Sequence, residues 1–117
     1  MAQREADLRG VSVVVPMYNE SANARPFWES LSKVLAEYGQ PYEIIFVDDG
    51  SRDGSWATIC QLSAKDTRVH GLRFRRNFGK AAGLSAGIRA ATSDVIFMMD
   101  ADLQDDPAEI PRFLDKM

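Results

Sequence analysis

Cysteine is nearly absent from this sequence, since Cys60 is the only one among 117 residues. A single thiol excludes a framework of internal disulfides and a zinc site made of cysteines. Long hydrophobic runs are also missing, because no apolar stretch approaches the roughly 18–20 residues that cross a bilayer. The first residues carry charges and no apolar core, so they do not resemble a signal peptide. We therefore expect a soluble, cytoplasmic protein or fragment.

A surplus of positive charge is missing as well. Fourteen basic and seventeen acidic side chains give a net charge of −3, whereas general binders of polyanions are strongly basic. We therefore expect no nucleic-acid partner. The apolar content of 45% and the charged content of 26% are typical of a folded chain, and the length corresponds to about one domain.

Short apolar runs alternate with longer amphipathic segments along the chain. The runs predict four buried strands, at residues 11–16, 42–47, 69–74 and 94–99. The other segments predict four helices: Ser21–Tyr38, a segment capped by Ser51 or Asp53 with Trp56, Ile59 and Cys60 on one face, residues 79–92, and a last helix opened by Asp105 or Asp106 before Pro107. This order predicts an α/β fold, a Rossmann-like and mostly parallel sheet with helices on both faces. Right-handed crossovers favour the strand order 3-2-1-4.

Ligands of such sheets bind beyond the carboxyl ends of the strands, where the winding direction switches. The predicted switch lies between the first and fourth strands. The loops that leave the strands should therefore meet at one edge, and they hold nearly all the candidate chemistry: residues 16–20, 48–53, 75–80 and 100–106.

The tripeptide Asp100-Ala101-Asp102 follows the fourth predicted strand. In extended backbone, residues i and i+2 project to the same side about 6–7 Å apart, so two carboxylates can share a hydrated Mg²⁺ or Mn²⁺. Alternatively, these acids only cap the last helix and solvate a loop. Five aspartates from residue 94 to residue 106, with no basic residue among them, favour a cation.

Two other strand ends have a functional and a structural interpretation. Asp48 and Asp49 end the second predicted strand, where a carboxylate suits the N–H groups of a uracil or guanine base or the hydroxyls of a ribose. A turn into the next helix explains this pair equally well. After the first strand, Tyr18 offers a face for stacking a base, whereas Asn19 and Glu20 equally suit capping of the first helix.

A cationic loop follows the third predicted strand and suits a pyrophosphate held opposite the acidic loop. Its basic residues are Arg73, Arg75, Arg76 and Lys80. Gly79 and Lys80 do not form a P-loop, because Phe74 stands where that motif has its first glycine and Ala81 where it has serine or threonine. No Gly-x-Gly-x-x-Gly follows the first strand, so a dinucleotide-binding domain is not favoured either.

Four motifs in this order resemble one known family. They are VVVPMYNE at residues 13–20, FVDDGS at 46–51, RNFGK at 76–80 and MDADLQ at 99–104. Together they are similar to family-two glycosyltransferases, inverting enzymes with an A-type nucleotide-sugar fold. The last two motifs are most similar to the branch that moves a hexose onto polyprenyl or dolichyl phosphate. The resemblance implies an N-terminal tail, residues 1–10, and a nucleotide-sugar-binding portion, residues 11–117.

The resemblance implies roles for the matching positions. Pro16, Tyr18 and Glu20 would hold the base and ribose of a UDP- or GDP-linked sugar, and Asp49 with Asp48 would read the base. Asp100 and Asp102 would hold Mg²⁺ or Mn²⁺ and the sugar diphosphate, with Gln104 beside them and Lys80 on a phosphate. The catalytic residue stays unknown, since an acceptor lipid phosphate at the cytoplasmic face of a membrane is already anionic and needs little help from a base.

Members of this family continue beyond the helix that follows Asp-x-Asp, into an acceptor-binding half. We therefore expect these 117 residues to bind donor without transferring sugar, and to self-associate through the bare edge of residues 94–99. A non-catalytic nucleotide-binding remnant or interaction module of the same fold is the alternative. A phospho-receiver domain is disfavoured, because its acids gather after the first and third strands.

Overall fold

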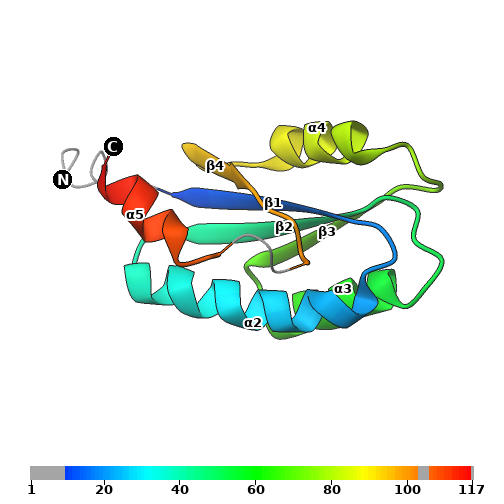
Figure 1. The fold of residues 1–117 in the computed structure, drawn as a ribbon, viewed down its shortest axis with the longest axis horizontal. Helices are drawn as coiled ribbons and strands as arrows, with labels where there is room; N and C mark the ends of the chain where they lie inside the picture. Colours follow the sequence, from blue (N-terminus) through cyan, green and yellow to red (C-terminus); the bar gives the residue numbers. More distant parts are fainter. Residues whose placement is uncertain (1–9, 103–105, 117) are drawn as a thin grey trace.

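The computed structural model describes residues 10–102 and 106–116 (Figure 1). In chain order the elements are β1 (Val11–Met17), α2 (Ser21–Tyr38), β2 (Tyr42–Asp48), α3 (Ser55–Lys65), β3 (Val69–Arg73), α4 (Lys80–Ala90), β4 (Val95–Met98) and α5 (Glu109–Asp115). The strands form one parallel sheet in the order β3-β2-β1-β4, as predicted. Of the expected tail, residues 1–10, only Gly10 lies within the described residues.

Helices cover both faces of the sheet. Helices α2, α3 and α5 lie on one side of it and α4 lies alone on the other (Figure 1). The larger core fills the side of α2 and α3 around Phe27 and Phe46, and a smaller one joins Val14, Ile45 and Val47 under α4. β1 is buried along its whole length, which explains why its sequence is continuously apolar rather than alternating.

Small residues let α4 approach the sheet closely. Gly83 and Gly87 are its buried positions, and a Cβ at Gly87 would collide with the side chain of Val14 in β1. The alanine- and glycine-rich composition of this helix therefore serves packing. As a consequence, the first residue of α4, Lys80, lies at the carboxyl edge of the sheet.

Some predicted helix boundaries are wrong. α3 begins at Ser55, after a loop in which Asp53 Oδ1 accepts the Ser55 N–H at 2.9 Å. The prediction that Cys60 shares the buried face of Ile59 is also wrong. Ile59 is buried, whereas Cys60 is exposed, because consecutive residues of a helix project in different directions. Pro107 lies in a turn before α5, which starts at Glu109.

Because α5 has Ala108 at its N-cap position and no side-chain cap, the predicted capping by Asp106 is wrong. Asp106 Oδ1 accepts the N–H of Ala108 at 3.0 Å, whereas the helix itself begins one residue later. Asp105, the other predicted cap, lies outside the described residues.

β4 is an edge strand with an apolar outer face. Among the described residues it pairs with β1 alone. Val95 and Phe97 pack against the larger core, while Ile96 and Met98 on the other face are 37% and 55% exposed. α4 leaves this face bare because it packs over β1 and β2 instead.

Self-association through this edge stays a prediction, and Met98→Lys tests it. A charge on an apolar edge strand opposes pairing with a second chain, so the variant should sediment as a smaller species than the unaltered chain at equal concentration. Ala64→Lys, an exposed position on α3, is the matched control and should sediment like the unaltered chain. A monodisperse monomer for the unaltered chain in sedimentation velocity would contradict the prediction.

Candidate functional site

A pocket of about 470 Å³ opens at the carboxyl edge of the sheet. It is lined by residues from the end of β1, the start of α4 and the loops that follow the four strands: Pro16, Met17, Tyr18, Glu20, Asp49, Asn77, Gly79, Lys80, Asp100 and Asp102. Seven of these were predicted as site residues: Pro16, Tyr18, Glu20, Asp49, Lys80, Asp100 and Asp102. The pocket therefore lies where the strand order predicts it, at the switch between β1 and β4.

One further predicted residue, Asp48, does not line this pocket. Gln104 lies outside the described residues. Asp48 is fully buried, and its Oδ1 accepts the N–H of Ser51 at 3.0 Å in the turn after β2. Its Oδ2 is buried without a hydrogen-bond partner among the described residues. This geometry matches the interpretation of Asp48 as a residue that forms the turn into the next helix.

The carboxylate of Asp49 fastens the loop before α4 to the end of β2. Asp49 is 4% exposed, and its Oδ1 accepts the N–H of Phe78 at 2.7 Å. Its Oδ2 accepts the N–H of Gly79 at 2.9 Å and Nδ2 of Asn77 at 3.1 Å. These donors compensate a charge that burial would otherwise destabilise. The reading of a base by Asp49 stays a prediction.

Gly50 allows the same two loops to touch. Its φ is +76°, which glycine adopts without strain. A Cβ at this position would collide with the backbone of Arg76 and lie 2.5 Å from the nitrogen of Asn77. The glycine is therefore needed for its conformation and for a close approach that the sequence does not reveal.

The loop after β1 is tied to the loop after β2. The N–H of Asn19 donates to Ser51 Oγ at 2.8 Å, and Asn19 Oδ1 accepts the N–H of Arg52 at 2.9 Å. The N–H of Glu20 donates to Ser55 Oγ at 3.0 Å. The capping interpretation of these side chains is wrong, because α2 begins without a side-chain cap.

Glu20 faces the two acids that follow β4. Burial raises the pKa of the Glu20 carboxyl, and the charges of Asp102 and Asp100 raise it further, against hydrogen bonds from Asn23 and Tyr18 that lower it. Tyr18 beside it is 46% exposed, so its ring is available to a planar ligand.

Lys80 and Asp100 form an ion pair across the pocket. Lys80 Nζ lies 2.9 Å from Oδ1 and 3.0 Å from Oδ2 of Asp100. The described residues hold no group of three or more metal-ligating side chains. A cation at Asp100 and Asp102 would therefore use two carboxylates together with water and ligand oxygens, a donor set that Mg²⁺ and Mn²⁺ accept.

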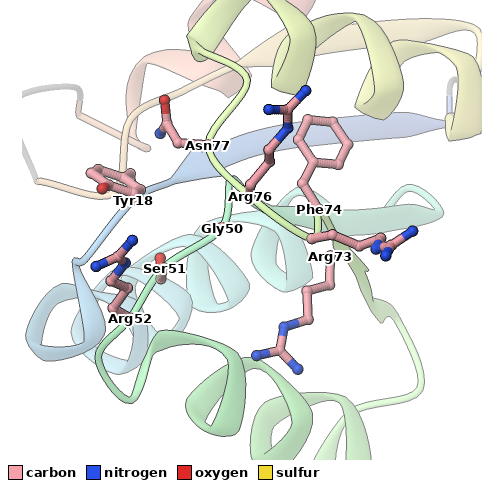
Figure 2. A pocket seen from close by; sticks show the side chains of 9 residues that line it. Tyr18, Gly50, Ser51, Arg52, Arg73, Phe74, Arg76 and Asn77 are labelled. Carbon is pink, nitrogen blue, oxygen red and sulfur yellow. The ribbon is translucent and has the colours of Figure 1, made fainter.

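The arginines of the cationic loop lie apart from this acidic pocket. They line a neighbouring pocket of about 420 Å³, which shares only Tyr18 and Asn77 with the first (Figure 2). Among the described basic residues of this loop, Lys80 alone lines the pocket of Asp100 and Asp102, so the expectation that the cationic loop stands opposite the acids holds for Lys80 and not for the arginines. Phe78 and Gly79 lie between the arginines and Lys80 along the chain.

Sequence reasoning gave no role to Asn77 or Gly79, although both lie inside a quoted motif. Their donors point at Asp49, a contact between residues 28 and 30 positions apart. The only signal in the sequence for this contact was an amide side chain followed, two residues later, by a glycine that precedes a helix.

Among the described residues, no helix has the length and apolarity needed to cross a membrane.

Comparison with known sequences gives a consistent result. Residues 12–117 match the family model described as Glycosyl transferase family 2. The undecaprenyl-phosphate 4-deoxy-4-formamido-L-arabinose transferase of Aeromonas hydrophila is 38% identical over 110 residues, 93% of this chain and 34% of that protein. The chain thus spans about a third of the length of the curated relatives it matches.

Solved structures share the fold. The mannosyltransferase PcManGT from Pyrobaculum calidifontis, in complex with GDP-Man and Mn²⁺, aligns with a TM-score of 0.62 at 28% identity, over 79% of this chain and 27% of that one. The glucosyl-3-phosphoglycerate synthase of M. tuberculosis aligns with a TM-score of 0.70 at 25% identity, over 93% of this chain and 42% of that one.

Proposed function

Since the chain belongs to glycosyl transferase family 2, we propose that its acidic pocket binds a nucleoside-diphosphate sugar whose hexose is transferred to a polyprenyl phosphate. The observation that carries this proposal is the pocket lining, which gathers seven predicted residues at the carboxyl edge of the sheet. Residues 11–117 would form the donor-binding portion.

The nucleoside would occupy the side of the pocket formed by β1 and β2. Tyr18 would stack on the base, and Pro16 and Glu20 would border the base and ribose. Asp49 would read the base, and Asp48 would support it by holding the turn after β2. Reading the base requires Asp49 to accept a ligand N–H in addition to, or in place of, one of its present donors. The lining suits uracil and guanine alike.

The diphosphate would lie between Lys80 and the two aspartates that follow β4. Asp100 and Asp102, with Gln104 nearby, would hold Mg²⁺ or Mn²⁺. Such a cation neutralises the charge of a diphosphate leaving group. The Mn²⁺ complex of the Pyrobaculum mannosyltransferase supports this assignment. Lys80 would exchange part of its contact with Asp100 for a phosphate oxygen, because a lysine ammonium can serve several acceptors.

The acceptor would be a lipid phosphate at the cytoplasmic face of a membrane. The names of the curated relatives support this choice, since they are undecaprenyl-phosphate transferases. A phosphate oxygen is already ionised, so attack on the anomeric carbon needs no general base. Transfer itself is proposed for the whole protein, of which these residues supply the donor site.

Asp102→Asn tests the metal assignment without requiring turnover. Mn²⁺ should strengthen the binding of UDP or GDP to the unaltered chain by about tenfold or more, as expected for charge-assisted contacts to a diphosphate. The variant should lose that gain. Isothermal titration calorimetry with and without Mn²⁺ measures both.

Asp94→Asn is the matched control, because this exposed aspartate precedes the opposite end of β4. It should keep the full effect of Mn²⁺. If Mn²⁺ changes the affinity of the unaltered chain for neither UDP nor GDP, the assignment is contradicted.

A further inference from the structure

Four arginines form an exposed cationic surface beside the acidic pocket, which we call the arginine face: Arg52, Arg73, Arg75 and Arg76. All four side chains are exposed. Arg52 lies in the loop after β2, Arg73 is the last residue of β3, and Arg75 and Arg76 lie in the loop after β3, all at the carboxyl edge. In a chain whose net charge is −3, this clustering makes the molecule electrically asymmetric. The donor pocket does not account for it, because none of the four lines that pocket.

The charges of the arginine face are not neutralised within the described part of the chain. None of the four arginines forms an ion pair with a carboxylate there. Arg73 stacks over Trp56 at 5.5 Å and Arg76 over Phe78 at 4.7 Å. Stacking on a ring orients a guanidinium and leaves its N–H donors available.

The guanidinium groups diverge rather than converge. Figure 2 shows Arg52 pointing toward Tyr18, Arg73 toward α3 and Arg76 toward α4. A single bound phosphate would require donors aimed at one point. Divergent donors suit several phosphates spread over a surface.

Aromatic rings border the same surface. Phe78 is 55% exposed and Tyr18 46% exposed. Arg73, Arg76 and Phe78 also border a shallow hollow of about 670 Å³. Arginines beside exposed aromatic rings are typical of residues that lie at the boundary between lipid headgroups and water.

We propose that the arginine face docks the carboxyl edge of this protein on a membrane surface rich in anionic phospholipids. The inference rests on the proposed function, in which the acceptor phosphate belongs to a lipid. Docking through this face turns the acidic pocket toward the headgroups, because the two pockets share Tyr18 and Asn77. The acidic remainder of the chain is repelled by the same surface, which favours one orientation.

The test compares the binding of the 117-residue chain to two kinds of vesicle, phosphatidylcholine alone and phosphatidylcholine mixed with phosphatidylglycerol. Co-sedimentation should occur only with the anionic vesicles and should weaken as salt is raised. The double variant Arg75→Gln, Arg76→Gln should bind roughly 30-fold more weakly, the effect of removing two arginines from an anionic surface.

The matched control is Arg68→Gln with Arg89→Gln, which removes the same charge from exposed positions outside both pockets. It should reduce vesicle binding far less than the Arg75, Arg76 variant. Equal reduction in the two double variants would overturn the proposal, because it would show a dependence on net charge alone.

Nucleotide and phosphate binding separate this proposal from the function on which it rests. The Arg75, Arg76 variant should bind UDP or GDP with Mn²⁺ as the unaltered chain does. Loss of that affinity would assign the arginine face to the donor site and overturn docking. Tight binding of inorganic phosphate to the arginine face without vesicle binding would overturn it too. Failure of the Asp102→Asn experiment alone would refute the metal site and leave docking supported.

Discussion

Replacing Asp49 by alanine should lower the free energy of unfolding by about 3–5 kcal/mol, the range for removing one side of a buried charged interaction. The change leaves the N–H groups of Phe78 and Gly79 without the acceptor that the carboxylate of Asp49, a residue only 4% exposed, supplies. Asp49→Asn should cost less, because one acceptor oxygen remains. Urea denaturation measures both.

Asp53→Ala is the matched control for this experiment. Asp53 also accepts two backbone N–H groups, those of Ser55 and Ser21, but it is exposed. Water can replace its carboxylate, so the loss should be about 1 kcal/mol. Equal losses in the two alanine variants would refute the view that burial makes Asp49 special.

The Asp49 variants also address base recognition. If Asp49 reads the base, the folded Asp49→Asn variant should bind UDP or GDP more weakly by roughly 1–3 kcal/mol, the cost of an unpaired buried donor. An unchanged dissociation constant would leave the residue with its positioning role alone.

Gly50→Ala should destabilise the protein by about 2–4 kcal/mol, through a strained φ and overpacking together. The methyl group would meet the backbone of Arg76 and Asn77, which cannot rotate away as a side chain can. Relief requires the loop before α4 to shift, and that loop is held by Asp49. Thermal unfolding measured by circular dichroism reports the loss.

Gly39→Ala isolates the conformational part of this effect. Gly39 has a φ of +88° and nothing within 4 Å of its Cβ direction. Alanine there should cost only about 1 kcal/mol, the strain of the left-handed region. A Gly50→Ala variant as stable as Gly39→Ala would show that the two loops are not in close contact.

The features predicted well from the sequence are those that local sequence patterns or the general rules of parallel sheets determine. The helix Ser21–Tyr38 has the predicted bounds, because an amphipathic stripe and Gly39 define its ends locally. Strand order followed from handedness and continuous apolar runs. The pocket lining followed because parallel strands bring their carboxyl ends together.

The features predicted poorly depend on contacts across the sheet. The bonds of Asp49 to the loop before α4 cannot be inferred from spacing, since the loop's path is set by α4 packing on β1. For the same reason the sequence did not show that Lys80 would face Asp100 while Arg75 and Arg76 line another pocket. The sequence shows which side chains are charged, but it does not show in which direction they point.

The hydrogen bonds that join the loops at the carboxyl edge bear on the order of folding. They connect positions as far apart as 28 residues between Asp49 and Asn77, 33 between Asn19 and Arg52, and 35 between Glu20 and Ser55. Closing segments of that length before the strands align costs entropy that one hydrogen bond cannot offset. The joined loops at the carboxyl edge of the sheet therefore form after β1, β2 and β3 have paired. A chain halted midway through folding would have its sheet but not its pocket.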